Sequence, residues 1–68
     1  MYRITTHHDD RHHPLDGDIR TVGSLGTLLA IALATFEDTM PAELADLLPG
    51  ERCEAYGFGV EYTVERIA

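Results

Sequence analysis

The 68-residue chain has no tryptophan, no lysine and only one cysteine, and each scarcity narrows the range of functions. Because Cys53 has no second thiol in the chain, no intramolecular disulfide can form, and a small secreted disulfide scaffold is excluded. We therefore expect a reducing, cytoplasmic environment. All five Lys/Arg residues are arginine, and against twelve acidic residues they leave a formal net charge of −7. This charge disfavours nucleic acid or an anionic membrane as a direct ligand and favours a basic partner.

Long hydrophobic runs are also missing. The longest apolar tract extends from Leu28 to Ala34, whereas a transmembrane helix needs about 20 residues. No apolar stretch follows the basic Arg3, so the start of the chain does not resemble a secretory signal. We expect a soluble protein with one domain over residues 1–68. A chain of this size hides only about 60% of its surface on folding, so association would help to stabilise it.

The spacing of apolar and turn-forming residues predicts six short elements. Tyr2, Ile4 and Thr6 alternate with polar residues as in a strand, and Ser24 is a suitable N-cap for a helix. Pro41 suits the first turn of a second helix. The predicted elements are a strand over 2–7, a short strand over 18–22, helices over 25–38 and 41–48, and two strands within 51–67 around Gly57-Phe58-Gly59.

This order predicts an α+β fold, in which a small antiparallel or mixed sheet of three to four strands packs on one central helix, with one short helix added. Leu44, Leu47 and Leu48 of the short helix must dock on the core, because so short a helix is marginal alone. The predicted core consists of Ile4, Leu25, Leu28, Leu29, Leu33, Phe36, Leu47, Val60, Tyr62 and Val64.

The other face of the predicted central helix has no charged residue. Thr27, Ala30, Ile31 and Ala34 stand where a solvated helix normally carries Lys, Glu or Arg. Two interpretations are open: loops of the same chain cover this face, or the helix of a second copy packs closely against its small side chains. We favour the second interpretation, which predicts a homodimer joined at this helix.

Four histidines and two aspartates fall within seven residues and are metal-ligand types. Imidazole nitrogen and carboxylate oxygen suit zinc, nickel, copper or manganese, but adjacent histidines on a strand point to opposite faces and the spacing matches no established site. We expect no physiological metal or other cofactor. A small metal-binding protein remains the alternative function, with the ligands His7, His8, Asp9, Asp10, His12 and His13.

The sequence gives little support for catalysis. Ser24 lacks the G-x-S-x-G context of a hydrolase nucleophile, and a capping role accounts for it. Cys53 stands between Arg52 and Glu54 in a predicted strand, where a packed residue is the commoner role. We therefore expect a binding protein and not an enzyme.

Acidic residues concentrate in the middle of the chain. Between residues 37 and 54 only Arg52 opposes them, although the dipole of the first predicted helix disfavours negative charge at its C-terminal end by roughly 0.3–1 kcal/mol per residue. A row of carboxylates on a firm surface can imitate phosphates and bind a Lys/Arg groove. A generic acidic surface is the competing interpretation. The candidate partner-binding residues are Glu37, Asp38, Glu43, Asp46, Glu51 and Glu54.

A short, acidic, single-domain α+β chain with concentrated carboxylates resembles the small phage-borne inhibitors of the anti-CRISPR type. The resemblance is one of overall character, without a shared motif, so no residue role is transferred. It implies a non-enzymatic inhibitor or adaptor that binds a basic nucleic-acid-handling protein, such as a CRISPR effector subunit, and does not bind nucleic acid directly. A purely structural subunit is a third interpretation.

Overall fold

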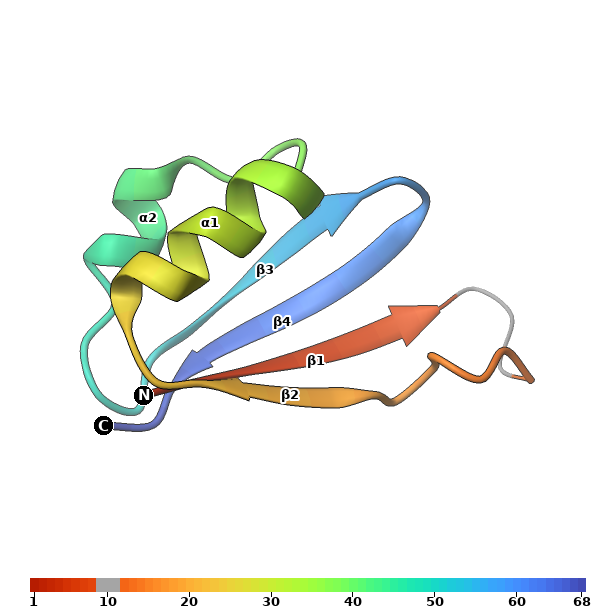
Figure 1. Ribbon diagram of the computed structural model, residues 1–68, viewed down its shortest axis with the longest axis horizontal. Coiled ribbons are helices and arrows are strands. Elements are labelled where there is room, and N and C mark those ends of the chain that lie inside the picture. Colours follow the sequence, from red (N-terminus) through yellow and green to blue (C-terminus); the bar gives the residue numbers. More distant parts are fainter. Residues whose placement is uncertain (9–11) are drawn as a thin grey trace.

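The computed structural model describes residues 1–8 and 12–68, which form one four-stranded antiparallel sheet and two short helices (Figure 1). The predicted α+β class is confirmed. The elements in chain order are β1 (Tyr2–His8), β2 (Ile19–Val22), α1 (Leu25–Thr35), α2 (Pro41–Ala45), β3 (Arg52–Gly57) and β4 (Val60–Arg66). Both helices lie on the same side of the sheet (Figure 1).

The strand order is β2-β1-β4-β3, so the first and last strands of the chain form the centre of the sheet. Ile4 of β1 pairs with Val64 of β4, and both side chains are buried on the helix side. Because side chains alternate between the two faces of a strand, Thr5 and Thr63 are directed to the opposite side. The topology therefore leaves one face of the sheet without a helix above it.

Both helices are shorter than predicted. The hydroxyl of Ser24 caps α1 by accepting from the Thr27 N–H at 3.2 Å, as expected. However, α1 ends at Thr35 and not at Asp38, because Phe36 is extended and the chain turns towards β3. Helix α2 begins at Pro41 as predicted but ends at Ala45.

The core forms where α1 and α2 cover the sheet. Five of the ten predicted core residues are buried and Leu25, Leu29 and Tyr62 pack partly against them, but Leu33 is 79% exposed. Helix α1 meets the sheet through the Leu28 and Ala32 side, from which Leu33 points away. Beyond the end of α2, Leu47 is buried but Leu48 is exposed. The buried residues are Tyr2, Ile4, Val22, Leu28, Ala32, Phe36, Leu44, Leu47, Ala55 and Val64.

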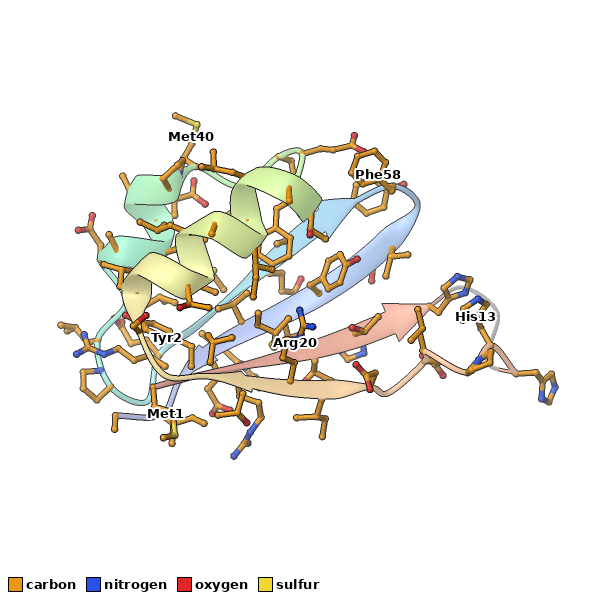
Figure 2. All side chains as sticks on the ribbon, in the orientation of Figure 1. Met1, Tyr2, His13, Arg20, Met40 and Phe58 are labelled. Carbon is orange, nitrogen blue, oxygen red and sulfur yellow. The ribbon has the colours of Figure 1, made fainter. Side chains whose placement is uncertain are left out.

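A two-residue turn joins β3 to β4. Gly57 pairs with Val60, and Phe58 and Gly59 between them have φ values of 54° and 78°. Positive φ at both turn residues is the requirement of a type I′ hairpin, for which Asn-Gly is the preferred sequence. Phe58 is a bulky residue in a conformation that favours glycine or asparagine, and its ring is exposed at the end of the hairpin (Figure 2). Among the described residues, no helix is both long and apolar enough to cross a bilayer.

Candidate functional site

The uncovered face of the sheet carries polar side chains in three rows across the strands. In the first row Glu65 lies between Arg3 and Arg52, and its carboxylate forms an ion pair of 3.2 Å with Arg3. In the next row Thr63 lies between Thr5 and Glu54. In the last row Glu61 lies between His7 and Tyr56. Positive charge therefore gathers at one end of the face and negative charge at the other.

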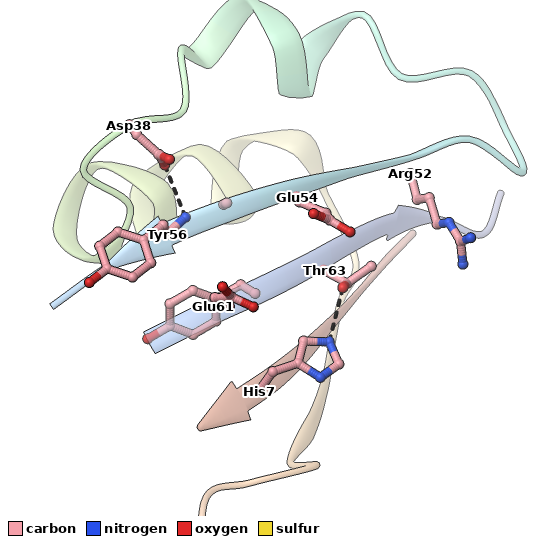
Figure 3. A pocket seen from close by; sticks show the side chains of 9 residues that line it. His7, Asp38, Arg52, Glu54, Tyr56, Glu61 and Thr63 are labelled. Carbon is pink, nitrogen blue, oxygen red and sulfur yellow. Dashed lines mark hydrogen bonds between the residues drawn. The ribbon is translucent and has the colours of Figure 1, made fainter. Parts of the chain in front are cut away.

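A hollow of about 530 Å³ occupies this face and extends to the loop that follows α1 (Figure 3). The side chains around it are acidic, aromatic and hydroxylic, with one arginine and one histidine at the edge. At the His7 side, the ring Nε2 and the Thr63 hydroxyl are 3.0 Å apart and hydrogen-bonded. The lining residues are His7, Asp38, Arg52, Glu54, Ala55, Tyr56, Glu61, Tyr62 and Thr63.

Asp38 reaches the hollow because the loop after α1 is tied to the outer edge of β3. The Asp38 carboxylate accepts from the Tyr56 backbone N–H at 2.9 Å, and the Glu37 backbone N–H donates to the Tyr56 carbonyl at 2.8 Å. The Glu37 carboxylate accepts from the Phe58 N–H at 2.8 Å. These acids, which the dipole of α1 does not favour, thus satisfy backbone donors of an edge strand.

Among the described residues, no arginine forms an ion pair with the carboxylates that line the hollow. Within residues 1–8 and 12–68 the one side-chain ion pair is Arg3 with Glu65, which lies in the first row. Arg66 donates to the Leu47 carbonyl at 2.8 Å, away from the hollow. Glu54 and Glu61 are both exposed on the uncovered face. The site therefore presents acceptor groups and negative charge to solvent.

The six predicted partner-binding acids fall in four places. Asp38 and Glu54 line the hollow together, while Glu37 is bonded to the hairpin turn. Glu51 accepts from the Leu48 N–H at 2.8 Å in the turn before β3. The remaining two belong to helix α2 and its end, on the helix side of the sheet: Glu43 and Asp46.

Of the residues that line the hollow, only Asp38 and Glu54 belong to the predicted partner-binding set, and the most important members that it missed are Glu61 and Tyr56. Their signal was present in the alternation of the last two strands, which places Tyr56, Glu61 and Glu54 on one face once the hairpin register is known. The prediction considered charge only along the chain from Glu37 to Glu54. It did not follow the carboxylates across the sheet.

Cys53 lies on the helix side of β3 and is half-buried. Burial raises the pKa of its thiol above the ordinary value, and the negative charge of Glu43 raises that pKa further. A raised pKa leaves less thiolate at neutral pH, which is the opposite of what a nucleophilic cysteine needs.

The predicted histidine and aspartate ligands are only partly described. Asp9 and Asp10 lie outside the described residues. The rings of His8 and His13 stack with centroids 3.9 Å apart, while His7 is on the uncovered face beside Thr63. No group of three His, Cys, Asp or Glu side chains in the described part of the chain is arranged to hold a metal ion.

The predicted dimer face belongs to the outer surface of α1. Thr27, Ala30 and Ala34 are exposed, and Ile31 is half-buried beside the sheet. This face remains a predicted contact for a second copy.

No protein-family model, no curated protein and no solved structure matches the chain.

Proposed function

We propose that this protein is a non-enzymatic inhibitor or adaptor, of the anti-CRISPR kind, that binds a basic nucleic-acid-handling protein through the acidic hollow on its uncovered sheet face. The observation that carries the proposal is the meeting of Asp38, Glu54 and Glu61 beside Tyr56 on a face that no helix covers. The chain's net charge of −7 has the sign that a cationic partner attracts. The proposed place of action is the cytoplasm.

The chemistry of the hollow suits arginine and lysine side chains. Carboxylates accept charge-assisted hydrogen bonds from guanidinium and ammonium groups, which are stronger than bonds between neutral groups. Tyr56, which is 44% exposed, offers an aromatic face to the same cation. A protein groove that normally holds the phosphates of DNA or RNA displays these cations at its surface. In this proposal the carboxylates occupy the positions that phosphates would take.

The firmness of the surface supports the same proposal. Glu54 and Glu61 stand on adjacent strands, and Asp38 is held to β3 by the Tyr56 N–H. Side chains on paired strands lose less conformational entropy on binding than side chains on a free loop. The negative charges are therefore already arranged when a partner arrives.

The test is binding to a purified CRISPR effector, without its guide, at a series of salt concentrations. We expect affinity to fall steeply with salt, and we expect Glu54→Lys and Glu61→Lys each to weaken binding about tenfold, mainly through slower association. Glu43→Lys, on the helix side, is the matched control and should have a smaller effect because its charge is away from the hollow. Excess guide RNA should compete with the protein.

Retention of full affinity by the Glu54→Lys, Glu61→Lys double variant would contradict the proposed surface. A larger loss with Glu43→Lys than with Glu54→Lys would move the surface to the helix side.

A further inference from the structure

The outer edge of β2 has unused backbone hydrogen-bonding groups. The Thr6 N–H donates to the Asp18 carbonyl and the Thr6 carbonyl accepts from the Gly17 N–H, both at 2.8 Å, so the backbone groups of Thr6 point towards the β2 side. Bonded and non-bonded pairs alternate along an antiparallel ladder, so the backbone groups of Ile19 and Thr21 point away from β1. Among the described residues, no backbone or side-chain group hydrogen-bonds to these outward groups.

The two edges of the sheet differ in this respect. On the β3 edge, the N–H groups of Tyr56 and Phe58 are taken by the carboxylates of Asp38 and Glu37. Natural proteins protect edge strands with covering loops, proline, bulges, charged side chains or a very short strand. Strand β2 is short and carries Arg20, but it has no proline, and the loop after α1 covers only the opposite edge. The β2 edge is therefore available for pairing with another strand.

The side chains along β2 carry opposite charges two residues apart. Asp18, which precedes the strand, and Arg20 both line a small groove of about 150 Å³ on the helix side, between α1 and the sheet. Neither forms an ion pair with another described residue. On the other face of the strand Ile19 is 61% exposed. Ile19 thus stands between a cation and an anion on the opposite face that form no ion pair within residues 1–8 and 12–68.

We propose that β2 pairs antiparallel with β2 of a second copy, about a two-fold axis at Ile19, and so joins two sheets into one of eight strands. In this register Arg20 of each copy stands directly opposite Asp18 of the other, and the two Ile19 side chains meet on the uncovered face. Opposite charges and aliphatic groups in directly facing positions are the favourable cross-strand pairs. The outward N–H and C=O groups of Ile19 bond across the axis.

The charge pattern selects this register over its neighbours. A two-fold axis at Arg20 would place the two Arg20 side chains opposite each other, which is repulsive. An axis at Thr21 would place Arg20 opposite Val22 and leave both charges unpaired. If the pairing were shifted by one residue, outward backbone groups of one strand would face residues whose N–H and C=O point towards their own β1. Only the axis at Ile19 gives two ion pairs by symmetry.

The arrangement also keeps the acidic regions of the two copies apart. With a spacing of about 4.8 Å between strands, the two β3 strands at the ends of an eight-stranded sheet lie about 34 Å from each other. That separation is several times the screening length of about 8 Å at physiological salt. The net negative charge therefore opposes this dimer weakly. Each hollow stays open to its own partner.

The proposal is tested by a charge exchange measured with sedimentation equilibrium up to millimolar protein. We expect the natural chain to form dimers, and we expect Asp18→Arg and Arg20→Asp each to weaken dimerisation at least tenfold, because each creates two like-charge contacts. The double variant Asp18→Arg, Arg20→Asp restores opposite charges in the same register and should recover most of the affinity. Thr21→Pro removes an outward N–H without removing a ladder bond, and should also prevent dimerisation.

Amide hydrogen exchange shows which backbone amides become protected when the dimer forms. Protection of the Ile19 amide should rise with protein concentration in the natural chain and in the double variant, but not in Thr21→Pro. A chain that stays monomeric at millimolar concentration overturns the proposal. It is also overturned if dimers persist in both single variants, or if Ala34→Glu on α1 abolishes the dimer while Thr21→Pro leaves it intact.

Discussion

Gly57 of β3 lies directly against the backbone carbonyl of Thr35, the last residue of α1, and leaves no space for a β carbon. The contact fixes the distance between the end of α1 and the sheet. From there the chain turns through Phe36 to the loop that carries Asp38 to the hollow. One glycine in a strand therefore sets the position of a residue of the candidate site.

Gly57→Ala should destabilise the protein by about 1–3 kcal/mol, the usual range for forcing an extra methyl group into a packed core. The atoms that a methyl group would strike are backbone atoms of Thr35 and Phe36, which cannot move aside as a flexible side chain can. Urea unfolding followed by circular dichroism measures the change. Gly26→Ala, in α1 with open space around it, is the matched control and should stabilise the protein by about 0.5–1 kcal/mol. Equal effects at the two positions would contradict the close contact.

Glu37→Ala should lower the free energy of unfolding by about 1 kcal/mol, because it removes the acceptor of the Phe58 N–H. The same change also removes a negative charge from beyond the C-terminal end of α1, where the helix dipole disfavours it. This stabilising effect is of similar or smaller size. Glu43→Ala removes an acid whose carboxylate accepts no backbone hydrogen bond from the described residues, and it should change the unfolding free energy by less. If Glu37→Ala were neutral or stabilising, the carboxylate would not be holding the hairpin, and the loop would be free of β3.

Phe58→Asn should stabilise the hairpin, since asparagine accepts positive φ more readily than a bulky aromatic residue does. The avoided backbone strain is on the order of 1 kcal/mol. The Phe58 ring is 75% exposed, so little buried apolar area is lost. Thermal unfolding gives the measurement, and Gly59→Ala, at a φ of 78°, should shift the midpoint in the opposite direction. A fall in stability with Phe58→Asn would mean that the ring packs on the protein in solution.

Cys53 should react slowly with iodoacetamide at pH 8, because burial and then the charge of Glu43 raise the pKa of its thiol and reduce the thiolate fraction. Glu43→Gln removes the second cause, so the pKa falls and the alkylation rate at fixed pH rises. Asp46→Gln changes the same net charge at the end of α2 and serves as control. Mass spectrometry of the alkylated fraction over time provides the rates. An unchanged rate in Glu43→Gln would show that burial alone controls the thiol.

The sequence was sufficient to predict the kinds of elements and much of the core. Ser24, Pro41 and the glycines of the hairpin are local signals, and local backbone preferences decide where helices begin and hairpins turn. The alternation in residues 60–66 predicted β4 for the same reason. The end of α1 was predicted three residues too late, because Glu37 and Asp38 form bonds with β3 that replace another helical turn.

The buried face of α1 was predicted less well. Helical spacing places both Ala32 and Leu33 on the face of Leu25 and Leu29, but the structure buries Ala32 and exposes Leu33. Periodicity defines a broad apolar stripe, whereas the orientation of a helix on a sheet depends on which side chains permit close approach. Ala32 is small enough for that approach, whereas the spacing alone does not distinguish it from Leu33.

Sequence alone determined the sign of the charge, the lack of a disulfide and the α+β class, because composition and short-range spacing fix these properties. Tertiary structure decided which carboxylates meet. Glu54 and Glu61 come to one face through the local β3–β4 hairpin, but Asp38 joins them only through the attachment of its loop to Tyr56. Strand order likewise decided which edge is covered. The attachment of the loop and the strand order are set by the packing of the whole chain, and no local pattern encodes them.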